Sequence, residues 1–167
     1  MIRRLLLPLS LSLLLAGCGF QLRGLVAVPE ALQTLTLEGD SSTPVYQTLE
    51  RQLRANGIEL VSPPRETHYR IALYSEGFNR RAASLNTRGK TEEYELRSQL
   101  RFEIFDRNGD SATGPLEVSA ERTYRYDENN INAMQAEEAL LRDELRQNIA
   151  SQVIRRYLAL ATTASGS

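Results

Sequence analysis

The sequence is poor in the side chains that build metal and catalytic centres. Its 167 residues include one cysteine, one histidine and no tryptophan, whereas zinc sites draw on several histidines or cysteines. It also lacks a glycine-rich phosphate loop and a Gly-x-Ser-x-Gly turn. Acidic pairs occur at Glu92-Glu93 and Glu137-Glu138, but chain neighbours on a strand or a helix point in different directions. We therefore expect solvated acidic surface at both pairs, no metal or cofactor, and no enzyme activity.

The chain has no strong excess of charge of either sign. Lys and Arg together number 20 and Asp and Glu 21, which gives a formal net charge of -1. Without Arg3 and Arg4, which lie in a leader that we expect to be removed, the net charge becomes -3. Nucleic-acid-binding proteins usually carry a basic patch and a high isoelectric point. We therefore expect no nucleic-acid partner.

The only long apolar run in the sequence, Leu5–Leu15, is too short to cross a bilayer, because a transmembrane helix needs about 20 apolar residues. Arg3 and Arg4 precede it, and the small residues Ala16 and Gly17 follow it. A basic start, an apolar centre and a small-residue end are typical of an export signal. We expect residues 1–17 to be a signal peptide that is cleaved.

The single cysteine, Cys18, follows this leader directly. The tetrad Leu15-Ala16-Gly17-Cys18 resembles the lipobox of bacterial lipoproteins, which implies a diacylglyceryl group on the thiol and an acylated amino terminus. Cysteine suits this chemistry because its thiolate is a good nucleophile, and more than one acyl chain makes anchoring stable. By resemblance to lipoprotein sorting rules, Gly19 after the cysteine, in place of Asp, favours the outer membrane of a Gram-negative bacterium, at its periplasmic leaflet. The alternative is an ordinary signal peptide with a chance cysteine.

Beyond the leader, the sequence predicts residues 18–30 as an acylated N-terminus and tether, 31–161 as a single domain, and 162–167 as a disordered tail. Alternation of apolar and polar residues is clearest between Glu93 and Ile104, which is typical of a strand with one buried face. Apolar residues spaced by four predict helices. The expected strands cover residues 32–38, 69–73, 93–104 and 116–126, the expected helices cover residues 45–56 and 131–161, and residues 58–61 are expected as a brief extended return.

These elements predict an α+β fold in the order strand, helix, strand, strand, strand, helix. Each strand has one apolar face and each helix one apolar stripe, so both helices should pack on one face of a four-stranded, mostly antiparallel sheet. The result is a two-layer sandwich. The other face of the sheet should be polar, with Arg97, Gln99, Arg101, Glu103, Thr123 and Arg125.

The sharpest local departure in charge lies between Arg80 and Lys90. This segment holds Arg80, Arg81, Arg88 and Lys90 and no acidic residue, and we expect it to form a long connection between two strands. One interpretation is an exposed basic hairpin that meets anionic groups such as lipid phosphates. The alternative is charge that keeps a sheet edge soluble and unpaired. Leu85 in its middle is an apolar residue of the kind that marks a contact.

Tyrosines give a second signal at the end of the third strand of this meander. Tyr124 and Tyr126 lie beside Arg122 and Arg125, and Tyr and Arg are enriched at the centres of interfaces. The alternative is that both tyrosines belong to the core or to the strand edge, with their hydroxyl groups reaching water.

Several segments together resemble the LptE family of lipopolysaccharide-assembly lipoproteins. They are Cys18–Gly24 (CGFQLRG), Leu49–Leu60, Ala83-Ser84 with Gly89–Tyr94, and the helix end Gln152–Arg156. Their order and spacing cover nearly the whole chain from Cys18. The resemblance implies a small α/β sandwich that plugs the lumen of the outer-membrane β-barrel LptD, supports assembly of that barrel and binds lipopolysaccharide.

The resemblance also implies where lipopolysaccharide is contacted. Family basic residues in the strand connection and at the start of the last helix align here with Thr87 and Gln135. The resemblance therefore transfers only the location of the contact, the connection between the two strands. The basic residues of that segment, Arg80, Arg81, Arg88 and Lys90, are the candidates for contact with lipid A phosphates or the barrel wall.

Two rival functions remain open at this point. One is an anchored hydrolase of envelope polymers, which would need His68 or convergent carboxylates in a cleft; we expect His68 at the surface. The other is an auxiliary lipoprotein of another envelope transport machine, such as an inner-membrane transporter.

Overall fold

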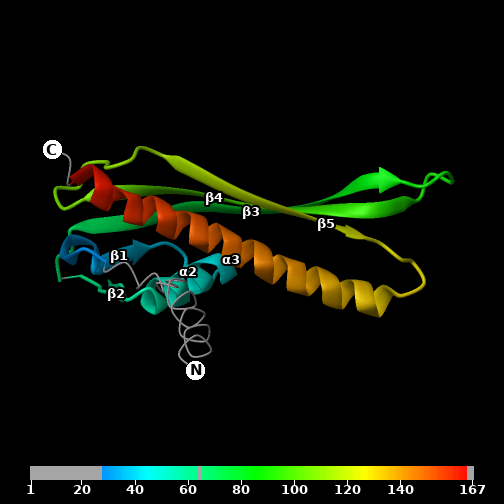
Figure 1. Ribbon diagram of the computed structural model, residues 1–167, viewed down its shortest axis with the longest axis horizontal. Coiled ribbons are helices and arrows are strands. Elements are labelled where there is room, and N and C mark those ends of the chain that lie inside the picture. The colour runs from blue at the N-terminus through cyan, green and yellow to red at the C-terminus, as the bar shows by residue number, and fades with distance from the viewer. Residues whose placement is uncertain (1–27, 64, 165–167) are drawn as a thin grey trace, which may run out of the picture.

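The structure, a computed structural model, describes residues 28–63 and 65–164, which form an elongated two-layer arrangement (Figure 1). The expected leader, Cys18 and most of the tether lie outside the described residues. In chain order the elements are η1 (Glu30–Leu32), β1 (Thr34–Glu38), α2 (Pro44–Ala55), β2 (Glu59–Leu60), β3 (Tyr69–Leu85), β4 (Thr91–Asp106), β5 (Leu116–Arg125) and α3 (Ile131–Ala164). The predicted α+β class is confirmed.

The sheet has five strands in the order β2-β1-β3-β4-β5, one more than expected. β1 runs parallel to both β2 and β3, and the β3, β4 and β5 meander is antiparallel. The extra strand is the segment expected only as an extended return, held by hydrogen bonds from the Glu59 and Val61 amides to the Gln33 and Leu35 carbonyls. A strand of two residues is too short to give a periodic signal.

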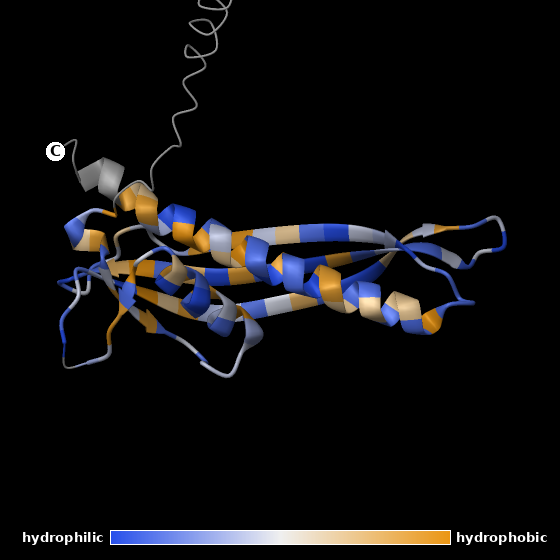
Figure 2. Cartoon of the chain, turned by 60° about the horizontal axis from the view of Figure 1, so that its bottom comes forward, coloured by the Kyte–Doolittle hydropathy of each residue, from blue (hydrophilic) through white to orange (hydrophobic). Residues whose placement is uncertain are grey.

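Both helices cover the same face of the sheet, as predicted. The stripe Val45, Leu49 and Leu53 of α2 is fully buried. α3 buries Leu145, Ile149, Ala150, Val153, Ile154 and Tyr157, and the sheet contributes Ile71, Leu96, Leu100, Phe102 and Ile104. Burial of one such large side chain stabilises the fold by about 1.5–3 kcal/mol before entropic costs, so this cluster is the main source of stability. In Figure 2 apolar (orange) and polar (blue) residues alternate along α3 and along the strands of the sheet.

The ends of the helices follow from local chemistry. Pro44 occupies the first turn of α2, and the Thr43 hydroxyl accepts a hydrogen bond from the Tyr46 amide, which satisfies a donor that the helix itself cannot pair. Gly57 takes a positive φ of 79° just past the helix. α3 continues to Ala164 and so includes the first three residues of the expected tail.

The largest error of the sequence prediction concerns the length of β3. The strand does not end near Leu73 but continues to Leu85, so Arg80 and Arg81 lie inside a strand and not in a loop. A register shift between Leu73 and Ser75 reverses which residues face the helices. Because the bulge interrupts the alternation and the following residues are polar on both faces, the sequence shows no strand period there.

Candidate functional site

The candidate site is the distal hairpin, defined as residues 77–99: the end of β3, its turn and the start of β4. β1 pairs with β3 only from Tyr69 to Ala72, so the hairpin extends beyond β1. It lies at the end of the molecule opposite β1 and the C-terminal end of α3 (Figure 1). The four basic candidates all belong to it.

Asn86 shapes the turn that presents Arg88. Its side-chain oxygen accepts hydrogen bonds from the Arg88 and Lys90 amides at 2.9 and 3.1 Å, and its own amide donates to the Lys90 carbonyl at 2.8 Å. Gly89 takes a φ of 75°, a region that glycine adopts without strain. The Arg88 side chain is exposed and forms no ion pair with any residue that the structure describes.

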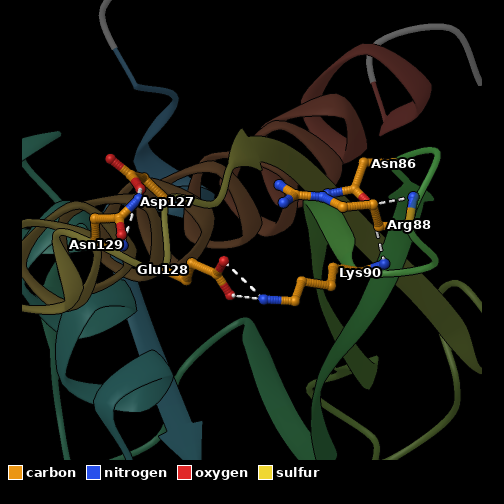
Figure 3. A network of polar contacts seen from close by, with 6 residues as sticks. All are labelled: Asn86, Arg88, Lys90, Asp127, Glu128 and Asn129. Atoms are coloured by element: carbon orange, nitrogen blue, oxygen red, sulfur yellow. Dashed lines mark hydrogen bonds and ion pairs between the residues drawn. The ribbon is translucent and has the colours of Figure 1, made fainter.

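Lys90 is paired with an acid from a different segment. Its Nζ lies 2.8 Å from both carboxylate oxygens of Glu128, which belongs to the connection between β5 and α3 (Figure 3). An open hollow of about 350 Å³ lies between the turn and this connection and is also lined by Arg88 and Arg125. Both partners of the ion pair are about half exposed, so an anionic ligand can compete with Glu128 for Lys90.

Arg80 is held against α3. Its guanidinium carbon lies 3.8 Å from the centre of the Tyr94 ring, and its Nη1 lies 3.1 Å from Glu138 on α3. Arg142, one turn further along α3, donates to the same carboxylate at 2.5 Å and stacks over Phe78 at 4.2 Å. Arg80 therefore ties β3 to α3 and is not free to bind a ligand.

Glu138 is the centre of this network, with only 12% of its side chain exposed. Burial alone would raise the pKa of the Glu138 carboxyl, but hydrogen bonds from Tyr124 and Arg142 and the charge of Arg80 outweigh it, so the pKa is lowered. The expectation of solvated surface at Glu137-Glu138 is right for Glu137 and wrong for Glu138. The spacing of Glu138 and Arg142 by four residues was a signal for one of these pairs.

The tyrosines belong to the same network. Tyr124 is 5% exposed, and its hydroxyl donates to Glu138 at 2.8 Å. Its ring stacks on Tyr94 with 5.9 Å between centres, and Tyr126 meets Tyr94 edge-on at 5.2 Å. Burial and the Glu138 hydrogen bond raise the pKa of Tyr124 to about 12. The interpretation of these tyrosines as core residues is confirmed for Tyr124, and Tyr126 packs half-buried beside it.

Arg81 points to the opposite face from Arg80, where no helix lies. It makes two hydrogen bonds to Glu95 on β4, at 2.7 and 3.0 Å, and the first of these lowers the pKa of the Glu95 carboxyl. The helix-free face is polar, as predicted, with a further ion pair between Arg97 and Glu121. The structure thus brings Arg88 and Lys90 together in the turn and separates them from Arg80 and Arg81.

His68 lies at the surface, as expected, beside Arg107. The described residues contain no group of three or more histidine, cysteine or acidic side chains placed to hold a metal ion. None of the helices that the structure describes is both long enough and apolar enough to cross a bilayer.

Comparison with known proteins gives a family match over most of the described residues. The model of the family "LptE: Lipopolysaccharide-assembly" matches residues 32–157. A relative from Pectobacterium atrosepticum, named LPS-assembly lipoprotein LptE, is 32% identical over 157 residues, which cover 92% of this chain and 84% of the relative.

Two solved structures have a similar fold. Rare lipoprotein B from Shewanella oneidensis aligns with a TM-score of 0.67 at 22% identity, over 80% of this chain and 97% of that one. Lipoprotein B from Nitrosomonas europaea aligns with a TM-score of 0.74 at 20% identity, over 86% of this chain and 93% of that one. At this identity the likeness concerns the fold.

Proposed function

Because the chain belongs to the LptE family of lipopolysaccharide-assembly lipoproteins, we propose that it plugs and helps to assemble the LptD outer-membrane β-barrel and so takes part in delivering lipopolysaccharide to the outer leaflet. The family match over residues 32–157 carries this proposal. The polar, helix-free face of the sheet supports it, since the interior of a large membrane barrel is hydrated and lined with polar side chains.

We further propose that the turn of the distal hairpin contacts lipopolysaccharide directly. Arg88 offers an unpaired guanidinium, which matches the geometry of a phosphate, and Lys90 adds a second charge that it now shares with Glu128. Thr87, which the resemblance aligns with a basic residue of the family, lies in the same turn. Arg80 and Arg81 support the hairpin through their ion pairs with Glu138 and Glu95.

The membrane attachment in this proposal is a lipid. Cys18 carries the diacylglyceryl group and an acylated amino terminus after loss of residues 1–17, and the protein stands at the periplasmic leaflet of the outer membrane. Mass spectrometry of the protein extracted from membranes tests this directly. The expected mass is that of residues 18–167 with three acyl chains, and Cys18→Ser should leave the protein unprocessed.

A non-enzymatic role also follows from the proposal. The hydrolase alternative needs His68 or convergent carboxylates in a cleft. His68 lines an open hollow with Glu30 and Glu66, but among the described residues its ring bonds to Arg107 and not to a carboxylate. Glu138 is engaged by two arginines and a tyrosine. The auxiliary-transporter alternative differs in location, and fractionation of inner and outer membranes distinguishes it.

Copurification tests the proposed partner. The full-length lipoprotein with a C-terminal tag, extracted from outer membranes in mild detergent, should bring down LptD in a stable complex. A tagged unrelated outer-membrane lipoprotein controls for the lipid anchor and for trapping in micelles. Recovery of the tagged protein without any large β-barrel would refute the proposal.

A further inference from the structure

In the distal half of the sheet the two outer strands, β3 and β5, differ in how far side chains cover their free backbone groups. Beyond Ala72, β3 has a neighbouring strand only on its β4 side among the described residues. Glu76 still contacts the start of α2, through Thr43 and the Val45 amide, so the open stretch begins at Gly77 and continues to Leu85. The edge of β5 lies on the other side of the same sheet.

The β5 edge is closed by side chains. Gln152 on α3 donates to the Ser119 carbonyl at 2.8 Å, and Arg122 donates to the Glu121 carbonyl at 2.9 Å. Both carbonyls therefore point away from β4. The long side chains that reach them occupy the positions where a further strand would form its hydrogen bonds.

The same two bonds fix the orientation of β3. Backbone groups of successive residues in an antiparallel ladder point alternately to the two sides. The backbone groups of Ser119 and Glu121 point away from β4, so those of their ladder partners, Gln99 and Arg97, point toward β3. The β3 residues that pair with Gln99 and Arg97 direct their own backbone groups toward β4. The residues that alternate with them along β3, Phe78, Arg80 and Ala82, therefore direct their amide and carbonyl groups to the open side.

Nothing described covers these groups. No hydrogen bond from the described residues ends on the outward backbone of Phe78, Arg80 or Ala82. Charged side chains usually shield such an edge, but here both arginines turn inward across the sheet: Arg80 to Tyr94 and Glu138, and Arg81 to Glu95. Both guanidinium groups bind these partners and do not cover the outward backbone groups, so a strand template remains exposed.

We propose that this open edge, residues 77–85 of β3, binds an extended segment of the barrel partner as an added β-strand. Main-chain hydrogen bonds would supply the affinity, as in other cases of strand addition. Apolar side chains near each end of the edge, Phe78 at 42% and Leu85 at 61% exposed, provide contacts for alternate side chains of the segment. An acidic residue of the bound segment, beside the hairpin turn, would form an ion pair with the unpaired Arg88.

A second copy of this chain fits the edge less well. Full antiparallel overlap of two such edges would centre on Arg81 and place the Arg80-Arg81 pairs of the two copies beside each other. A strand of the barrel wall is also unsuitable, because a closed barrel has no free strand edge. The occupant is therefore a segment outside the wall. The inference rests on the proposed function, because it takes the barrel as the partner.

Hydrogen exchange tests the added strand. Exchange of the amides of residues 77–85 is followed by mass spectrometry with residue-resolving fragmentation, for the free lipoprotein and for its purified complex with the barrel. In the free chain the Phe78, Arg80 and Ala82 amides should exchange fast and the amides between them slowly. In the complex these three should slow at least tenfold. A complex in which they exchange as in the free chain would overturn the inference while leaving the proposed function intact.

Proline variants give an independent test. Ala82→Pro removes one outward amide without breaking a β4 hydrogen bond and should reduce recovery of the barrel about tenfold. Thr123→Pro, the matched control, removes an outward amide from the closed β5 edge and should retain full recovery. Circular dichroism checks folding, and if Ala82→Pro is unfolded, the exchange comparison decides.

The remaining outcomes are also decisive. Equal recovery with folded Ala82→Pro would overturn the inference. Concentration-dependent protection of the three amides in the free chain would mean that two copies pair, which overturns the barrel segment as occupant. Failure of any complex to form would refute the proposed function itself, and the inference with it.

Discussion

The two ends of the molecule are stabilised in different ways, although β3 and β4 run through both. In the proximal sandwich, where α2, β1, β2 and residues 145–160 of α3 lie, the strands contribute side chains such as Phe102 and Ile104 that are fully buried. In the distal hairpin the same strands contribute Phe78, Arg80 and Tyr94, which are held by ring contacts and ion pairs with α3. One continuous ladder thus serves as core at one end and as a presented surface at the other.

This difference indicates which part of the fold can carry binding residues without loss of stability. Replacing a buried apolar residue of the proximal sandwich leaves a cavity that the packed core cannot close. A side chain in the hairpin turn, such as Arg88, has no partner among the described residues and can be changed at little cost. Side chains of the distal turn can therefore be replaced to suit a ligand, because the proximal sandwich maintains the fold.

The largest effect should come from a cavity in the proximal sandwich. Phe102→Ala should lower the free energy of unfolding by about 3–5 kcal/mol, because Phe102 is fully buried. Phe78→Ala, on the distal hairpin, should cost only about 1 kcal/mol, from lost contact with Arg142. Urea denaturation followed by circular dichroism measures both. Equal costs would mean that the distal hairpin is packed like the core.

The next effect should come from the centre of the distal network. Glu138→Gln removes the negative charge that faces Arg80 and Arg142 and should cost about 1–3 kcal/mol, since hydrogen bonds to charged groups are the stronger ones. Glu137→Gln is the matched control on the exposed face and should change stability by less than about 0.5 kcal/mol. If the two variants are equally stable, the network does not hold the hairpin to α3.

The contribution of Glu138 should depend on pH. Its pKa is lower in the folded protein than the ordinary value of 4.5, so the charged carboxylate stabilises the fold above about pH 4.5, and this stabilisation is lost as the pH falls through the folded-state pKa. The difference in unfolding free energy between wild type and Glu138→Gln should therefore be constant near neutral pH and shrink in acid. A difference that stays constant down to pH 3 would contradict the lowered pKa.

The smallest effect should come from the ion pair across the hairpin turn. Lys90 and Glu128 are both about half exposed, and exposed pairs contribute about 0–1 kcal/mol. Glu128→Gln should leave the melting temperature nearly unchanged and raise the affinity for lipopolysaccharide, because it frees Lys90. A clear loss of stability would show that the pair is structural.

Periodicity predicted the parts of the fold that have one apolar face. The alternation from Glu93 to Ile104 identified β4, and the stripe from Leu145 to Tyr157 identified the buried face of α3. β3 was predicted too short because the bulge after Leu73 shifts its alternation and both faces then carry polar residues. β2 was missed because a strand of two residues has no period.

The candidate site was only partly predictable. Charge composition pointed to residues 80–90 as a unit, but pairing partners come from distant segments: Glu138 and Glu128 lie after β5 and meet Arg80 and Lys90 only in the fold. A sequence cannot show which cations are neutralised in this way. In the structure Arg88 has no ion-pair partner among the described residues, whereas Lys90, Arg80 and Arg81 are paired with Glu128, Glu138 and Glu95.

The proposed recognition of lipopolysaccharide depends on the distal turn and not on basic charge in general. The most direct test compares binding of purified lipopolysaccharide by Arg88→Glu/Lys90→Glu with binding by Arg155→Glu/Arg156→Glu, which makes the same charge change on an exposed part of α3 at the other end of the molecule. We predict that the first variant loses at least about tenfold in affinity, equivalent to about 1.4 kcal/mol, while the second binds as wild type does. Equal losses in both variants, or none in the first, would contradict the claim.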